Sequence, residues 1–144
     1  MSLNTKNGLF AESGSAVTAT SCTISKNGEW GVYGYYYASP KIYKSIITGN
    51  KGGGIYCQLY ECIVVINGSV LTGNTDIEVK NGGDTEWDLR GNFWGASLTK
   101  SLKANNGVVS SPSIVGKVRM DEFLEETPKE CGASITSLNG QKLW

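Results

Sequence analysis

Carboxylates in the second half of the chain are the side chains best suited to chemistry. Five of them lie within thirteen residues and an arginine follows: Asp76, Glu78, Asp84, Glu86, Asp88 and Arg90. Two carboxyl groups at a suitable separation can hydrolyse a glycosidic bond, and several carboxylate oxygens can hold Ca²⁺. The chain has no histidine, which excludes imidazole acid-base chemistry and a Ser-His-Asp triad.

We nevertheless expect no catalytic site, because the acidic residues do not recur in an aligned column and can simply solvate the surface. If the chain is an enzyme, its candidates are Asp84, Glu86, Asp88 and Arg90. We expect no resident metal or other cofactor.

Composition narrows the class of protein further. With 40% hydrophobic and 18% charged residues, a chain of 144 residues can bury one core. The 13 basic and 13 acidic residues cancel and form no long run, so nucleic acid is not an expected partner. No apolar segment has the length of a signal peptide or a membrane span. We expect a soluble protein without a membrane partner, and the compartment stays open.

One motif recurs with a period of about 23 residues. The motif consists of an aliphatic residue, any residue, a glycine or lysine, and then asparagine, and it occurs at 24–27, 47–50, 71–74 and 89–92. Its asparagines are separated by 23, 24 and 18 residues. Five positions after the first three asparagines come Val32, Ile55 and Val79. Short alternating apolar runs at a fixed period predict stacked coils of three short parallel strands.

The recurring asparagine makes the chain resemble the right-handed parallel β-helix proteins of the pectate-lyase-like superfamily. In that family, asparagines at one corner form a ladder between coils, and Asn27, Asn50 and Asn74 resemble such a ladder. The segment Asn92-Phe93-Trp94-Gly95 resembles the motif that ends the coils in many β-helix proteins. Structural roles are therefore expected for Asn92 and Trp94 too.

The resemblance covers about residues 4–95 and implies an all-β fold. We expect a right-handed single-stranded parallel β-helix of about four short coils, with an irregular C-terminal cap. The coils occupy residues 1–96, and residues 97–144 hold a strand near 116–120, a helical turn over 121–126 and a capping tail. The 18-residue spacing predicts a truncated or distorted fourth coil. A strand with a turn at Asn139-Gly140 is expected within 134–144.

The four cysteines show no metal-binding spacing. Cys57 and Cys62 are close enough in sequence for a local disulfide bond, but we expect buried thiols for Cys22, Cys57, Cys62 and Cys131.

Aromatic residues form the most suggestive candidate binding surface. Phe10, Tyr33 and Tyr56 stand one position after the inward aliphatic residue of their coils and should stack on one outer face. Trp30 and Tyr35 complete the expected ligand-binding set, and Tyr36, Tyr37 and Tyr60 lie nearby in sequence. Such a row can bind sugar rings, stabilise neighbouring strands or form an oligomer interface.

The function is less determined than the fold. We expect a non-catalytic β-helix module that binds carbohydrate or another partner through the aromatic face. Its first coil begins near Asn4, so the N-terminal end should associate with another copy or with the remainder of a longer β-helix. One alternative is a fragment or degenerate relative of a polysaccharide lyase or hydrolase. Lyases of this resemblance pair Ca²⁺ with an Arg or Lys base, so Ca²⁺ belongs to that alternative only. A purely structural assembly unit is the other alternative.

Overall fold

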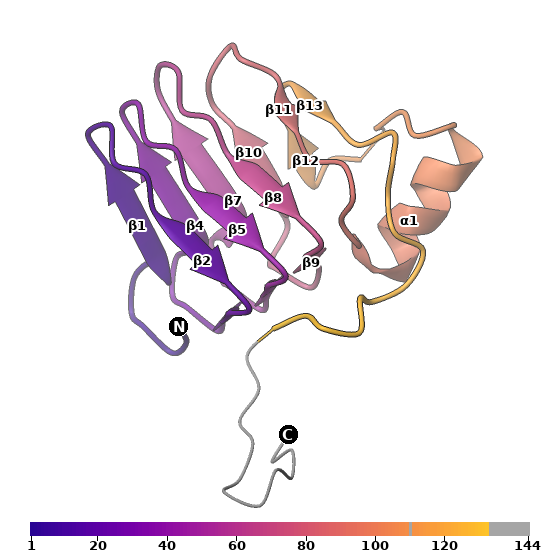
Figure 1. Cartoon of the computed structure of the whole chain (residues 1–144), viewed down its shortest axis with the longest axis horizontal. Helices are drawn as coiled ribbons and strands as arrows, with labels where there is room; N and C mark the ends of the chain where they lie inside the picture. Colours follow the sequence, from indigo (N-terminus) through magenta and orange to yellow (C-terminus); the bar gives the residue numbers. More distant parts are fainter. Residues whose placement is uncertain (110, 133–144) are drawn as a thin grey trace, which may run out of the picture.

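The computed structural model describes residues 1–109 and 111–132 of the chain. Parallel strands wind into a solenoid whose coils stack side by side (Figure 1). The largest sheet contains β1 (Leu9–Glu12), β4 (Trp30–Tyr35), β7 (Gly53–Gln58), β10 (Val79–Asn81) and β12 (Ile114–Val115). A second sheet contains β2 (Thr18–Thr20), β5 (Lys41–Tyr43) and β8 (Val65–Asn67). A third contains β3 (Thr23–Ser25), β6 (Ile46–Thr48) and β9 (Val70–Leu71).

Three complete coils therefore contribute one strand to each of these sheets. A partial coil contains β10 and β11 (Trp87–Asp88), and a further one contains β12 and β13 (Val118–Arg119), which pairs with β11. The expected all-β solenoid of about four coils is confirmed. The β13 strand lies within the region where a late strand was predicted.

The register of the large sheet matches the sequence period. Leu9 pairs with Val32, Val32 with Ile55, and Ile55 with Val79, so each coil presents its aliphatic residue at the same height. All four side chains are buried, and full burial of a residue of this size contributes roughly 1.5–3 kcal/mol. Alternation along each strand directs the next residue outward.

An asparagine ladder joins the coils at the corner between the third sheet and the large sheet. The Nδ2 atom of Asn27 donates to Oδ1 of Asn50 at 2.8 Å, and Nδ2 of Asn50 donates to Oδ1 of Asn74 at 2.8 Å. Asn4 extends the ladder to the first coil with a 2.9 Å bond to Asn27. Each Oδ1 atom also accepts from the backbone N–H of the preceding ladder residue. The side chains thus bond the backbone of adjacent coils where no strand pairing exists.

A second ladder occupies the other corner, between the second and third sheets. Ser45 Oγ accepts from the Cys22 N–H at 3.0 Å, Ser69 Oγ accepts from the Ser45 N–H at 3.1 Å, and Asn92 Oδ1 accepts from the Ser69 N–H at 3.0 Å. Asn92 therefore belongs to this ladder, and its alignment with Asn74 is wrong.

The corrected register also explains the 18-residue spacing. Val70 forms a bridge with Phe93, which keeps the 23-residue offset through the fourth coil. The predicted irregularity lies instead after Phe93, because the chain leaves the coil at Trp94 and forms helix α1 (Gly95–Ala104). The β12 strand then rejoins the large sheet, with Val79 paired to Ile114.

The helix expected over residues 121–126 is wrong, since that segment contains no helix and α1 precedes it. Leu98 and Leu102, four positions apart on α1, are both buried, which is the spacing of one helix face. The helix lies beside the C-terminal end of the stack in Figure 1. The strand expected within 134–144 falls outside the described residues.

The expectation of four buried thiols is wrong, because Cys57 and Cys62 are bonded to each other and the thiols of Cys22 and Cys131 are only partly buried. Cys57 and Cys62 form a disulfide bond, whereas Cys22 and Cys131 are free thiols. Cys57 points inward from β7, and the tight turn after that strand brings Cys62 back into the core. Gly34 on the adjacent coil leaves the space, because a Cβ atom there would collide with both sulfur atoms.

Candidate functional site: an aromatic face and its tyrosine turns

The outward aromatics of the large sheet form an aromatic ridge of Phe10, Trp30, Tyr33 and Tyr56. The rings of Phe10 and Tyr33 stack at 5.5 Å, and those of Tyr33 and Tyr56 meet edge to face at 5.4 Å. Trp30 contacts Tyr56 at 5.1 Å. The strand register places Phe10, Tyr33 and Tyr56 in one column, so adjacent rings are forced into contact across about 4.8 Å of strand spacing.

This ridge is not the flat platform expected for sugar rings. The stacked rings of Phe10 and Tyr33 face each other, and the Lys80 ammonium lies 4.6 Å from the centre of the Tyr56 ring. The Tyr33 hydroxyl donates to Oε1 of Gln58, and burial together with the neighbouring Tyr56 raises the Tyr33 pKa. Much of the ridge therefore satisfies its own contacts.

A more open group of rings adjoins the ridge at the turns between the large and second sheets, along the upper edge of Figure 1. We call Tyr35, Tyr36, Tyr37 and Tyr60 the tyrosine cluster. Tyr36 meets Tyr37 and Tyr60 edge to face at 5.0 and 5.2 Å, and Tyr37 stacks on Tyr60 at 5.7 Å. All four side chains are exposed, and Tyr60 reaches 59% exposure.

The backbone that holds this cluster adopts an unfavourable conformation. Tyr36 and Tyr37 have φ angles of 51° and 61°, and Leu59 and Tyr60 have angles of 63° and 56°. The left-handed region costs a non-glycine residue roughly 1–2 kcal/mol. The first coil turns at the same place with Ser13 and Gly14, so a small residue suffices for the geometry. Bulky residues at strained positions point to a role beyond the turn itself.

The sequence predicts Tyr35 as part of the binding set but gives Tyr36, Tyr37 and Tyr60 only as neighbours of that set. The available signal was the run of three tyrosines that aligns with Glu12, Ser13 and Gly14 one period earlier. Small turn-forming residues and tyrosines therefore occupy equivalent positions.

Two of the catalytic candidates, Asp88 and Arg90, form an ion pair with each other. Arg90 donates from Nε to Asp88 Oδ1 at 2.8 Å and from Nη2 to Asp88 Oδ2 at 2.6 Å, and its Nη1 lies 3.3 Å from Glu122 Oε1. Hydrogen bonding from Arg90 lowers the Asp88 pKa to about 2, and the bond to Asp88 raises the Arg90 pKa. A general acid needs the opposite shift at a carboxyl group, and an arginine base needs the opposite shift at the guanidinium.

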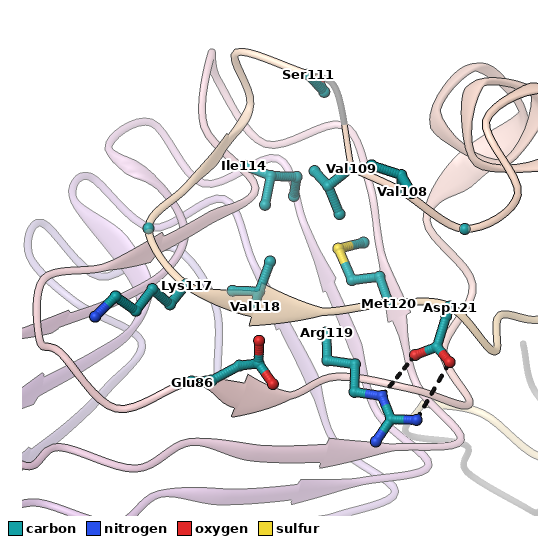
Figure 2. A pocket seen from close by; sticks show the side chains of 12 residues that line it. Glu86, Val108, Val109, Ser111, Ile114, Lys117, Val118, Arg119, Met120 and Asp121 are labelled. Carbon is teal, nitrogen blue, oxygen red and sulfur yellow. Dashed lines mark hydrogen bonds and ion pairs between the residues drawn. The ribbon is translucent and has the colours of Figure 1, made fainter.

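Asp84 lies apart from this ion pair, whereas Glu86 lines one depression of about 620 Å³ together with Asp88 and Arg90. Asp84 Oδ1 is 3.7 Å from Lys117 Nζ. Glu86 also lines a second depression, of about 750 Å³, at the last coils (Figure 2). The aliphatic side chains of Ile114 and Val118 line it, and Arg119 Nε donates to Asp121 Oδ1 at 2.8 Å. The charges of Arg119 and Asp121 therefore neutralise each other.

Within residues 1–109 and 111–132, no group of three or more His, Cys, Asp or Glu side chains is placed to hold a metal ion. No helix in the same described ranges has the length and apolarity to cross a membrane.

Glu78 is a buried carboxyl group that closes the asparagine ladder. Its Oε1 accepts from the Asn74 N–H at 3.2 Å and its Oε2 accepts from Asn74 Nδ2 at 2.6 Å. These bonds replace those that a further ladder asparagine would make. Burial raises the pKa of Glu78, although the hydrogen bonds from Asn74 oppose the shift. The residue was one of the clustered acids in the sequence, but its ladder role required the register of the fourth coil.

The family model for the right handed beta helix region matches residues 1–94. This match covers more than half of the chain, so the protein belongs to the right-handed β-helix family. Comparisons with curated proteins and with solved structures find no match.

Replacing Glu78 with Gln should change how stability depends on pH. Between the ordinary pKa of 4.5 and the raised folded-state value, the folded protein retains a proton that the unfolded chain has lost, so stability falls as pH rises. Urea unfolding of both proteins from about pH 4 to about pH 7 should show the wild type losing stability relative to Glu78→Gln. The wild type should show no such loss of stability relative to Glu126→Gln, a change at an exposed carboxylate. Parallel pH curves for wild type and Glu78→Gln would contradict the raised pKa.

Proposed function

We propose that the protein is a non-catalytic β-helix module that binds a carbohydrate chain through the tyrosine cluster and the adjoining aromatic ridge. The observation that carries the proposal is the placement of exposed tyrosines at left-handed turn positions, where the first coil uses Ser13 and Gly14. Tyrosine combines an apolar face with a polar tip, which suits it to sugar rings and their hydroxyl groups.

The geometry supports an elongated ligand. Tyr35 ends β4 and connects the cluster to the ridge, because Tyr33 lies two residues earlier on the same strand. From there, Phe10 and Tyr56 extend across the neighbouring coils. A ligand along this face would cross three coils, contacting open rings at the turns and ring edges on the sheet.

The enzyme alternative has less support. A lyase or hydrolase would use Asp84, Glu86, Asp88 or Arg90, and the Asp88–Arg90 bonds hold both groups in charged states unsuited to proton transfer. In the structural alternative, the rings only stabilise the stack. Removing a ring would then leave the affinity for polysaccharide unchanged, whereas under the binding proposal it lowers that affinity.

Tyr37→Gly and Tyr60→Gly should each weaken polysaccharide binding by about tenfold, since each removes two ring contacts and an exposed face. Glycine accepts the left-handed backbone, so the melting temperature should change by only a few degrees. Affinity electrophoresis in gels containing neutral, acidic and amino-sugar polysaccharides measures the binding.

Ser13→Gly is the matched control, because it relaxes the equivalent turn of the first coil without removing a ring. It should leave binding unchanged. Retardation of both tyrosine variants equal to that of the wild type, or no retardation of the wild type by any polysaccharide, would contradict the binding proposal.

Self-association is a second candidate role, favoured by the exposed edge of the first coil. Within the described chain, β1 and β2 each pair with a strand on one side only, and Phe10 beside this edge is 50% exposed. Unpaired edges can add a strand from another chain.

Sedimentation velocity should therefore show a dimer or larger species at tens of micromolar protein. Phe10→Lys should shift the distribution toward monomer, because a charge on an edge strand opposes pairing. A wild-type protein that sediments as a monomer throughout this range would exclude this role.

A further inference from the structure

The turns between the large and second sheets, two of which carry the tyrosine cluster, contain charges of one sign. They comprise residues 12–17, 35–40, 58–64 and 81–86, counting the last residue of each preceding strand. Four residues in these segments are acidic, namely Glu12, Glu61, Asp84 and Glu86, and none is Lys or Arg. The chain as a whole has 13 basic and 13 acidic residues, so this edge of the solenoid departs from its overall neutrality.

Two of these carboxylates lie directly beside the tyrosines. Glu12 is paired in register with Tyr35 on the adjacent strand, and Glu61 follows Tyr60 in the chain. Both residues are exposed, and neither forms an ion pair within the described residues. Their charges are therefore available to a ligand on the cluster. Asp84, by contrast, lies near Lys117.

The aromatic face already binds an ammonium group of the protein itself. The Lys80 Nζ atom lies 4.6 Å from the centre of the Tyr56 ring, within the distance at which a cation is attracted to the π-face. Tyr36, Tyr37 and Tyr60 offer rings of the same kind next to carboxylates that no lysine neutralises. A cationic ligand would gain from both groups, whereas a polyanion would be repelled by the carboxylates.

From this charge complementarity we infer that the ligand of the tyrosine cluster is a cationic amino-sugar chain with free ammonium groups, in place of an acidic polysaccharide. The inference rests on the proposed carbohydrate-binding function. The pyranose rings contact the tyrosine faces, and the ammonium groups lie close to Glu12 and Glu61. No covalent step is involved.

Isothermal titration calorimetry with three oligosaccharides of equal length tests the inference. The probes are a glucosamine oligomer, its fully N-acetylated counterpart and a galacturonate oligomer, at a mildly acidic pH where the amines are protonated. The glucosamine oligomer should bind about tenfold more tightly than the acetylated one, and the galacturonate oligomer should bind weakest. Added salt should reduce the difference, because exposed charges are screened.

The double variant Glu12→Gln/Glu61→Gln should remove most of the preference for glucosamine while keeping the affinity for the acetylated oligomer. Glu126→Gln, an exposed carboxylate outside these turns, should keep the preference. Equal binding of the glucosamine and acetylated oligomers, or tighter binding of galacturonate, would overturn the inference and leave carbohydrate binding intact. Absence of binding to all three would overturn the proposed function together with the inference.

Discussion

The buried asparagine side chain is the interaction on which the stacked coils depend. At the corners the chain leaves the β-ladder, so backbone groups there need other partners in the interior. Asn27, Asn50 and Asn74 provide them: the side chains of Asn27 and Asn50 accept from the preceding coil and donate to the next ladder asparagine. The Asn74 side chain accepts from Asn50 and donates to the Ile47 carbonyl and to Glu78. Buried polar groups without partners would cost roughly 1–3 kcal/mol each, and the ladder satisfies several of them with one residue type per coil.

The two ladders end differently. Glu78 closes the C-terminal end of the asparagine ladder with a group that only accepts in its charged form, and the chain later forms α1. The second ladder ends in an asparagine at the same stage, where Asn92 takes the position held by serine in earlier coils.

The ladders and the aliphatic core leave the turns between the large and second sheets freer to vary. Ser13 and Gly14 meet the backbone requirement in the first coil, and Tyr36 and Tyr37 meet it at higher cost in the next. The disulfide bond between Cys57 and Cys62 closes the turn that contains Tyr60. A rigid scaffold thus presents variable turns, an arrangement typical of binding surfaces.

The sequence predicted the repeat geometry well because coil-to-coil contacts are between residues one period apart. The sequence period directly predicts the column of Val32, Ile55 and Val79 and the matching column of asparagines. It misplaced Asn92, because the same short motif occurs at two different corners. The sequence could not predict the strained turns at Tyr36 and Tyr60, because backbone angles leave no periodic signal. It also could not predict the ladder role of Glu78, because there a carboxylate takes the place of the repeating asparagine. Helix α1 has only two buried leucines and lacks a strong pattern.

The free energy of unfolding of Asn50→Ala, measured in urea, tests the dependence on the ladder most directly. Loss of this fully buried side chain removes the partners of Asn27, Asn74 and the Ile24 carbonyl, so we predict a destabilisation of about 2–4 kcal/mol. Asn67→Ala removes an exposed amide with one hydrogen bond to the Arg90 carbonyl and should cost less than about 1 kcal/mol. A cost at Asn50 no larger than that at Asn67 would contradict the dependence of the stack on its ladder.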